Sequence, residues 1–392
     1  MKYLIVHDAA PGQFVHIYKH LLKTGDHDIL VASRKGSTLR LPVKQVVYDL
    51  PENLAGPDVG FADKAVGLGL NLYRELKPMA ISGWVPDVIL SHASRGASYF
   101  LKDLFPDARM VSLFEWYYGV PSPAEVKTGA ALRQKCRSAA ATNMPILRDF
   151  ELMDAGYVPT EFQRAQFPRG WQSRLEVLHD GVDTDLYRPA SSLTLEVSGK
   201  RFRKGDEIMT YAGRGMEHTR GFMQFMAAAA KVQGIRPNLH VLIAGADRIC
   251  YDGKKGPGLK ARAEEEIPFD KDRTHFVGLL PEAKFVSFLQ ISSLHVYLTR
   301  PFVLSWSMLN AMSVGAPVLG SDTAPVREVI RDGENGRLVD MDNADALADA
   351  MDRMLGDRAG SAALGKTGRA TILEKYDLKK CLKRQLELMH GQ

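Results

Sequence analysis

The sequence has few cysteines and no long apolar run. Its 392 residues include 3 cysteines, Cys136, Cys250 and Cys381, which lie far apart and form no Cys-x-x-Cys pair. This spacing argues against a disulfide framework and a structural zinc site, and it fits a reducing compartment. No stretch reaches the roughly 18 apolar residues of a spanning helix, and the amino-terminal apolar segment is too short for a secretory signal. We expect a soluble, cytoplasmic protein.

The sequence also lacks an excess of either charge. The 51 Lys and Arg residues against 46 Asp and Glu residues leave a formal net charge of +5. This near-balance excludes a polycationic nucleic-acid coat and an acidic tail, so no nucleic-acid partner is expected. The length favours two domains, because one domain usually takes roughly 100–200 residues.

Short apolar, β-rich runs alternate with longer helical stretches in both halves of the chain. In the first half, strands are expected at 3–6, 28–32, 87–91 and 108–114, with a helix at 14–22. In the second half, a helix begins at Phe222 and strands are expected at 207–211, 240–244, 275–277, 293–297 and 317–321. This rhythm predicts an α/β protein made of two doubly wound, Rossmann-like domains.

A turn-rich segment at 179–189, followed by a polar segment at 190–206, predicts the joint between the domains. We expect a first domain at 1–185, a second at 200–372, and a helix at about 376–392 that packs back on the first. Open parallel sheets bind ligands outside the carboxyl ends of their strands. Two such domains would face each other across a cleft, and the strand-to-helix turns should carry the chemistry.

Two residues of the first half are candidates for a site. Gly12 lies in the turn between the first strand and its helix, where a glycine lets backbone amides approach an anion. A plain turn is the alternative, since no GxGxxG motif is present. His92 follows the strand expected at 87–91, a position suited to acid–base work, with a structural histidine as the alternative.

The second half holds a sharper pattern. Gly213-Arg214 and Arg220-Gly221 follow a predicted strand, and arginine forks match phosphate oxygens, so a diphosphate site is predicted. A solvated basic loop is the alternative. A helix start at Ser305, Trp306 and Ser307 offers further amides to an anion. Ser305 or Ser307 acting only as an N-cap is the alternative there.

Acidic residues of the second half have simpler explanations. Glu328 is expected early in a helix, where the helix dipole favours a carboxylate. Residues 332–336 are expected to form a surface turn. The Asp-x-Asp patterns at 183–185 and 340–342 are common by chance, and we do not expect them to bind a metal.

In this order the turns resemble the family 4 glycosyltransferases of the glycosyltransferase-B fold, over nearly the whole chain. The arginine turn is similar to the phosphate-binding turn of that family, and the segments 311–318, 321–322, 328–330 and 332–336 are similar to its donor-site signature. The first half resembles a bacterial subgroup in Pro11-Gly12-Gln13-Phe14, in the segment 100–107, and in Phe114-Glu115-Trp116-Tyr117-Tyr118.

The resemblance implies transfer of a sugar, with retention at the anomeric carbon, from a UDP- or GDP-linked donor. It implies a glycan, lipid-linked or other hydroxyl acceptor, a role in bacterial surface polysaccharide synthesis, and no metal or other cofactor. His92, Arg214 and Arg220 would be the catalytic residues. The nucleotide sugar would be bound by Gly12, Gly213, Leu279, Leu280, Ser305, Trp306, Ser307, Asn310 and Glu328.

The sequence departs from the family at two positions. Phe302 and Asn310 stand where the family usually has glutamates. Their loss leaves two alternatives open: a binding or scaffold protein without turnover, and a sugar-nucleotide epimerase on the same fold. Basic residues suggest peripheral contact with the inner face of a membrane, although an ordinary solvated helix face explains them better; they are Lys127, Arg133, Lys135 and Arg137.

Overall fold

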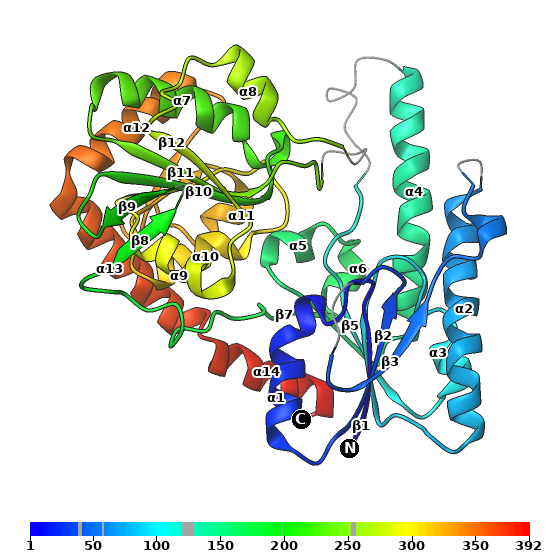
Figure 1. The fold of residues 1–392 in the computed structure, drawn as a ribbon. Coiled ribbons are helices and arrows are strands. Elements are labelled where there is room, and N and C mark those ends of the chain that lie inside the picture. The colour runs from blue at the N-terminus through cyan, green and yellow to red at the C-terminus, as the bar shows by residue number, and fades with distance from the viewer. Residues whose placement is uncertain (38–40, 57–58, 120–128, 198, 252–255) are drawn as a thin grey trace. The chain divides into compact units, whose positions relative to one another are not determined.

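The computed structural model describes residues 1–37, 41–56, 59–119, 129–197, 199–251 and 256–392. They divide into two units, one of Met1–Asp180 with Lys380–Gln392 and one of Gly181–Lys379. Each unit is built on a parallel sheet with helices packed on both faces (Figure 1). The predicted fold class, α/β with two doubly wound Rossmann-like domains, is confirmed.

The first unit contains a seven-stranded parallel sheet in the order β3-β2-β1-β4-β5-β6-β7. Its strands are β1 (Lys2–Val6), β2 (Asp28–Arg34), β3 (Lys44–Tyr48), β4 (Val88–His92), β5 (Arg109–Leu113), β6 (Ala155–Val158) and β7 (Leu175–Val177). The strand order reverses between β1 and β4, and such a switch point is where open sheets of this kind bind ligands.

Alternate residues of β1 pack on opposite faces of this sheet. Tyr3 and Ile5 pack with α1 and α14, whereas Leu4 and Val6 pack with α2 and α3. The Tyr3 hydroxyl also lies 2.9 Å from His390 Nε2, which ties the last helix to the first strand. The helices of this unit are η1 (Gly12–Phe14), α1 (Val15–Thr24), η2 (Glu52–Leu54), α2 (Phe61–Ile81), α3 (Leu101–Leu104), α4 (Gly129–Leu152), α5 (Glu161–Ala165), α6 (Arg169–Gln172) and α14 (Leu378–His390).

The second unit repeats this topology with a six-stranded parallel sheet in the order β12-β11-β10-β13-β14-β15. Its strands are β10 (Ile208–Gly215), β11 (His240–Ala246), β12 (Thr274–Gly278), β13 (Leu294–Tyr297), β14 (Val318–Ser321) and β15 (Arg337–Val339). Here the order reverses between β10 and β13, which places a second switch point at the carboxyl ends of these two strands.

Helices cover both faces of the second sheet. Met209 and Tyr211 of β10 pack with α7 and α12, whereas Ile208 and Ala212 pack with α9, α10 and α13. The helices are η4 (His218–Arg220), α7 (Phe222–Ile235), α8 (Lys260–Glu266), α9 (Glu282–Gln290), α10 (Trp306–Ser313), α11 (Ala324–Arg327), α12 (Ala344–Gly356) and α13 (Arg358–Lys375).

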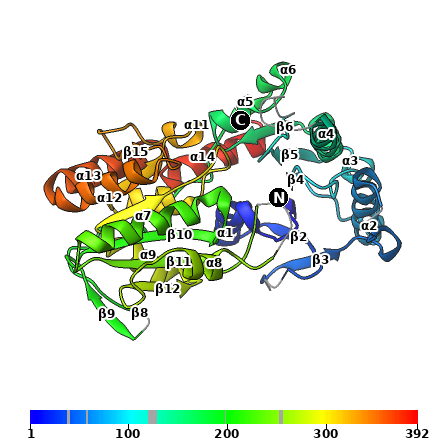
Figure 2. The same cartoon turned by 90° about the horizontal axis from the view of Figure 1, so that it is seen from above.

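The polar segment expected to be an irregular linker contains an antiparallel hairpin, β8 (Thr194–Val197) and β9 (Lys200–Arg203). Phe202 of this hairpin is 3% exposed and packs into the core of the second unit beside His240 and His275. Figure 2 shows the hairpin near β11 and β12. Each strand of the hairpin has only four residues, and an apolar alternation this short does not predict a strand from the sequence.

Candidate active site

Arg220 lies beside the switch point of the second sheet with its guanidinium buried. Its Nη1 donates to the Tyr297 hydroxyl at 3.0 Å and to Thr299 Oγ1 at 2.9 Å, and its Nη2 donates to the Val303 carbonyl at 2.9 Å. Only 5% of Arg220 is exposed, and all three acceptors are neutral. A buried cation without a bonded carboxylate is costly unless an anion joins it.

Two aromatic rings flank the same guanidinium. The Arg220 Cζ atom lies 5.3 Å from the Tyr251 ring centre and 5.5 Å from the Phe302 ring centre. The faces of aromatic rings attract cations, and this attraction increases when water is excluded. Phe302 therefore places an aromatic ring beside the Arg220 guanidinium, at a position where the family 4 glycosyltransferases usually have a glutamate.

The start of α10 joins this cluster through shared partners. The Tyr297 hydroxyl accepts from the Ser305 backbone N–H at 2.8 Å as well as from Arg220. Ser305 is the N-cap of α10, and its hydroxyl accepts from the Ser307 N–H at 3.4 Å. The Ser307 hydroxyl in turn donates to the Ala212 carbonyl of β10 at 3.4 Å. The N-cap alternative therefore holds for Ser305, and the positive end of α10 lies next to Arg220.

Asn310 lies on α10 with 8% of its surface exposed. Its side-chain amide forms no hydrogen bond with any residue that the structure describes, although buried amides normally have partners. Trp306, at the start of the same helix, is 38% exposed. An amide without a partner in the described protein is able to bind a ligand hydroxyl.

Gly213 and Arg214 do not form the turn that was predicted. They belong to β10, which continues through Gly215 after a shift in its register with β11. The strand continues because glycines allow close backbone contact: a Cβ atom at Gly215 would lie 2.3 Å from the Arg248 carbonyl oxygen. Arg214 is exposed and forms no hydrogen bond or ion pair within the described part of the chain.

The other predicted donor-site residues follow other strands of the second sheet. Leu279 and Leu280 follow β12; Leu279 is 66% exposed, whereas Leu280 packs against the core. Glu328 does not lie early in a helix. It is the C-cap of the four-residue helix α11, because Thr323 and Pro325 begin that helix one turn before it.

The acidic pairs that were set aside as metal ligands have cationic partners. Asp342 pairs with Arg300, and Asp185 lies 2.8 Å from Lys379 Nζ. Across the described ranges, no group of three or more His, Cys, Asp or Glu side chains is placed to hold a metal ion. Residues 332–336 form the predicted surface turn, closed by a bridge between Asp332 and Gly336.

His92 is the last residue of β4, at the switch point of the first sheet. Its Nε2 lies 3.4 Å from Glu115 Oε2 and its Nδ1 lies 3.2 Å from the Ser94 hydroxyl. Burial opposes a charge on the imidazole, but the Glu115 carboxylate outweighs it and raises the pKa of His92.

Gly12 begins η1 with a φ of +53°, and its backbone lies against the His7 ring. A Cβ atom there would lie 2.3 Å from His7 Cε1 and Nε2, so only glycine leaves room for this ring. The contact connects Gly12 with His7 and Gln13, whose side chains are 2.7 Å apart. Gly12 remains a predicted anion-binding residue, and its packing role is clear.

Several residues of both clusters were not predicted as site residues. In the second unit they are Tyr251, Tyr297 and Thr299; in the first they are His7, Gln13, Ser94 and Glu115. In the sequence, Gln13 and Glu115 indicate only a resemblance to a bacterial subgroup of the family. Most of these residues lie at or just beyond the ends of strands. The strand order brings them together, and the sequence alone does not give that order.

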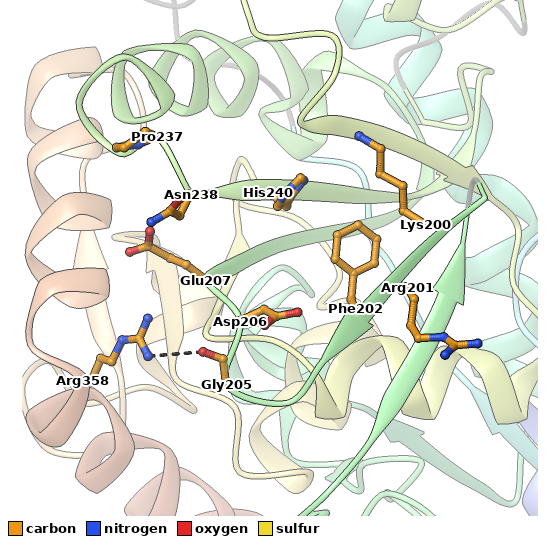
Figure 3. A pocket seen from close by; sticks show the side chains of 10 residues that line it. All are labelled: Lys200, Arg201, Phe202, Gly205, Asp206, Glu207, Pro237, Asn238, His240 and Arg358. Carbon is orange, nitrogen blue, oxygen red and sulfur yellow. Dashed lines mark hydrogen bonds between the residues drawn. The ribbon is translucent and has the colours of Figure 1, made fainter.

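A separate pocket of about 680 Å³ lies at the opposite, amino-terminal edge of the second sheet (Figure 3). Its charged walls are already engaged: Arg358 donates to the Gly205 carbonyl at 3.2 Å, and Glu207 pairs with Arg236. Ligands of such sheets bind at the carboxyl edge, so the Arg220 cluster is the better candidate. The pocket is lined by Lys200, Arg201, Phe202, Gly205, Asp206, Glu207, Pro237, Asn238, His240 and Arg358.

Two family models match the chain. Glycosyl transferase family 4 group matches residues 25–187, and Glycosyl transferases group 1 matches residues 196–371. Each model matches less than half of the chain, and the two together cover most of residues 25–371, so both units are similar to glycosyltransferase domains. The second match contains Gly213, Arg220 and Asn310, and the first contains His92 and Glu115.

Relatives agree with these matches. D-inositol 3-phosphate glycosyltransferase of Mycolicibacterium smegmatis is 26% identical over 60% of this chain and 55% of its own length. The chain spans about half the length of the curated relatives it matches first.

Solved structures extend the likeness of fold over the whole chain. Sucrose-phosphate synthase of Thermosynechococcus elongatus has a TM-score of 0.76 at 18% identity and covers 100% of this chain and 98% of its own. HepE of Anabaena, solved with UDP and glucose, has a TM-score of 0.70 at 13% identity and covers 100% of both chains. Both show that this chain has the glycosyltransferase-B fold.

In the described part of the chain, no helix combines the length and apolar character that crossing a bilayer requires. Of the basic residues considered for membrane contact, Arg133, Lys135 and Arg137 are exposed on α4. Lys127 lies outside the described residues.

Proposed function

We propose that this protein transfers a sugar from a nucleoside diphosphate sugar to a hydroxyl acceptor. The observation that carries the proposal is the buried guanidinium of Arg220, held by neutral partners at the carboxyl edge of the second sheet. Charge develops on the leaving diphosphate as the glycosidic bond breaks. A cation already oriented in a site of low dielectric stabilises such charge strongly.

Two further features support a diphosphate at this place. Arg214 lies next to the last residue of β10, is exposed, and is available to bind a second phosphate group. The start of α10 adds the positive end of a helix dipole beside Tyr297, which bonds both Arg220 and Ser305. The proposed reaction therefore uses cationic side chains and helix amides, with no metal or other cofactor.

The finer assignments follow the family resemblance. The proposed reaction retains the anomeric configuration, uses a UDP- or GDP-linked donor, and serves bacterial surface polysaccharide synthesis at the cytoplasmic face of the membrane. HepE was solved with UDP and glucose, and a relative from Mycobacterium tuberculosis is named GDP-mannose-dependent. The proposed acceptors are glycan or lipid-linked hydroxyl groups. The proposed contacts of the nucleotide base are Leu279 and Leu280. The remaining proposed contacts of the nucleotide sugar are Gly12, Gly213, Ser305, Trp306, Ser307, Asn310 and Glu328.

A second candidate is a nucleotide-sugar-binding protein without turnover. Phe302 and Asn310 favour it, because both positions lack the carboxylate of the resembled family. A sugar-nucleotide epimerase is the third candidate. All three bind a nucleoside diphosphate, so binding tests the assigned site and turnover separates the candidates.

A thermal-shift panel tests the binding site, because a ligand that binds the folded state raises the unfolding midpoint by mass action. The panel compares UDP, GDP, UDP-glucose and GDP-mannose with uridine and guanosine. We expect one base series to stabilise the protein, and its diphosphates to do so far more than the nucleoside. Equal shifts for nucleoside and diphosphate, or no shift for any compound, would contradict a diphosphate site at Arg220.

A further inference from the structure

A chain of polar side chains crosses the switch point of the first sheet. The Ala9 N–H donates to His7 Nδ1 at 3.0 Å, so that nitrogen is an acceptor and the ring proton lies on Nε2. His7 Nε2 then donates to Gln13 Oε1 at 2.7 Å, and Gln13 Nε2 donates to Glu115 Oε1 at 2.7 Å. The chain thus has one fixed direction, and it ends on the Glu115 carboxylate.

The other carboxylate oxygen of Glu115 faces His92. Glu115 Oε2 lies 3.4 Å from His92 Nε2, while His92 Nδ1 lies 3.2 Å from the Ser94 hydroxyl. His92 Nδ1 is hydrogen bonded and its Nε2 faces Glu115 at ion-pair distance, and 15% of the His92 side chain is exposed against 31% for Glu115. The group in this cluster that is open to a ligand is the carboxylate, with the histidine behind it.

The backbone of Glu115 is also held in place. Its carbonyl accepts from Gln163 Nε2 at 2.6 Å, and Gln163 is 1% exposed and bonded to Thr160, the N-cap of α5. A carboxylate has about four lone-pair sites, and among the described residues Gln13 donates to one oxygen of Glu115 while His92 faces the other. The remaining sites are oriented acceptors, as a ligand hydroxyl requires.

Two other carboxylates lie near His92 but are less suitable. Asp149 is 0% exposed and bonds Ser98, so no ligand reaches it. Asp8 accepts from the Tyr48 hydroxyl at 2.9 Å and lies 3.7 Å from Arg95 Nε, so one hydrogen bond and a looser ion pair hold it. Glu115 is accessible and is the carboxylate that Gln13 connects to His7 and that His92 faces at the end of β4.

We propose that Glu115 binds a sugar hydroxyl of the substrate as a hydrogen-bond acceptor, with His92, Gln13 and His7 as positioning residues that hold and orient its carboxylate. The proposal rests on the proposed function and adds a substrate contact that the sequence did not suggest. The hydroxyl belongs either to the glycosyl group of the donor or to a glycan acceptor, which share the same chemistry.

The charges around His92 and Glu115 favour this ion pair. Burial lowers the pKa of His7 to about 4, so His7 stays neutral and adds no repulsion. Burial also opposes the charged form of His92, but the carboxylates of Glu115, Asp8 and Asp149 face it from three elements and favour that form. A protonated His92 in turn keeps Glu115 ionised, since it lowers the pKa of Glu115 against the effect of burial.

The test compares Glu115→Gln with Glu151→Gln in the full chain. Glu151 is exposed on α4 and pairs with Arg148 three residues before it, so the same chemical change there is a matched control. Titration calorimetry gives the affinities for UDP and UDP-glucose, or GDP and GDP-mannose, whichever series the wild type binds. A panel of alkyl glycosides, followed by nucleoside diphosphate release, gives the acceptor KM.

We expect Glu115→Gln to weaken one sugar contact about tenfold, since a charged acceptor is replaced by a neutral one. If the hydroxyl is on the donor, affinity for the nucleotide sugar falls while affinity for the diphosphate is unchanged. If it is on the acceptor, both donor affinities stay and the acceptor KM rises. Glu151→Gln should change neither.

The positioning role has its own measurement. In histidine-labelled protein without ligand, NMR titration should show a lower His92 pKa in Glu115→Gln than in the wild type or in Glu151→Gln; an unchanged pKa would overturn the pairing. The sugar contact would be overturned if Glu115→Gln left both donor affinities and the acceptor KM unchanged. It would also be overturned if the donor affinities were unchanged and no glycoside stimulated the wild type. Failure of the wild type to bind any of the four nucleotides would instead overturn the proposed function.

Discussion

Arg220 and Arg214 are close in sequence but differ in their surroundings. Arg220 is buried on three neutral acceptors, whereas Arg214 is exposed at the end of β10. A buried cation of this kind contributes to both folding and ligand binding, while an exposed one contributes mainly to the ligand. The two residues should therefore behave differently when they are removed.

Arg220→Ala should weaken diphosphate binding by roughly 1.5–3 kcal/mol, the value of a charge-assisted hydrogen bond, and leave nucleoside binding nearly unchanged. It should also lower the unfolding midpoint, because Tyr297, Thr299 and Val303 lose their donor. Arg214→Ala should weaken diphosphate binding without changing the midpoint. Calorimetry and thermal unfolding check both, with the exposed Arg331→Ala as control; equal loss of nucleoside and diphosphate affinity would refute the assignment.

Asn310 offers a second test at the level of one side chain. Its buried amide lacks a partner among the described residues, whereas the resembled family has a glutamate that accepts from ribose hydroxyls. Asn310→Glu should therefore tighten nucleotide binding by roughly 1 kcal/mol, or about fivefold in Kd. Asn310→Gln, which adds the same length without charge, should not. An unchanged or weaker affinity in the glutamate variant would show that ribose is not bound at this position.

Asp149 should make stability depend on pH. Burial raises its pKa from 3.8 to about 7, so the folded chain holds a proton that the unfolded chain has lost. Stability from this group is complete below pH 4 and falls as the pH rises to about 7. Asp149→Asn should remove this loss of stability with pH. The difference in unfolding free energy between the variant and the wild type should therefore change in favour of the variant by on the order of 2 kcal/mol from pH 5 to pH 8. Urea unfolding at both pH values checks it, and a constant difference would contradict the burial effect.

At the scale of elements, the turn from β1 to α1 depends on Gly12. Its φ is +53° and the His7 ring fills the place of a side chain, whereas Gly25, with φ of +95°, has nothing within 4 Å. Gly25→Ala should cost roughly 1–2 kcal/mol of unfolding free energy from backbone strain alone. Gly12→Ala should cost clearly more and shift the His7 NMR signals, because the ring must leave Gln13. Equal costs for the two variants would show that the ring contact does not matter.

The sequence predicted the central strands well and the edges poorly. The runs at β1, β2, β4 and β5 are apolar because these strands are buried on both faces, and this pattern is visible without a structure. β3 is mostly exposed, and β7 and β15 have three residues each, so their pairing comes from neighbouring strands and not from their own pattern.

The same limit applies to the candidate site. Arg220 and Ser305 could be proposed because glycine and helix-start patterns surround them. Their shared partner Tyr297 could not, since it comes from β13, which only the strand order places beside β10. Glu115 was missed for the same reason: its partners His92 and Gln13 follow other strands.

At the scale of the whole molecule, both units follow one plan. Each sheet reverses its order beside its first strand, and each places a polar cluster at the carboxyl ends next to that reversal. The cluster of the first unit is centred on a carboxylate and a histidine, and that of the second on a buried cation.

One measurement tests the central claim of sugar transfer most directly. Proton NMR follows UDP-glucose and GDP-mannose incubated with the full chain, first with water as the only acceptor. We expect release of UDP or GDP with a free sugar that first appears in the anomeric form of the donor, and loss of this release in Arg220→Ala. A nucleotide sugar that binds but stays intact, or that converts to its epimer with the diphosphate still attached, would contradict the account.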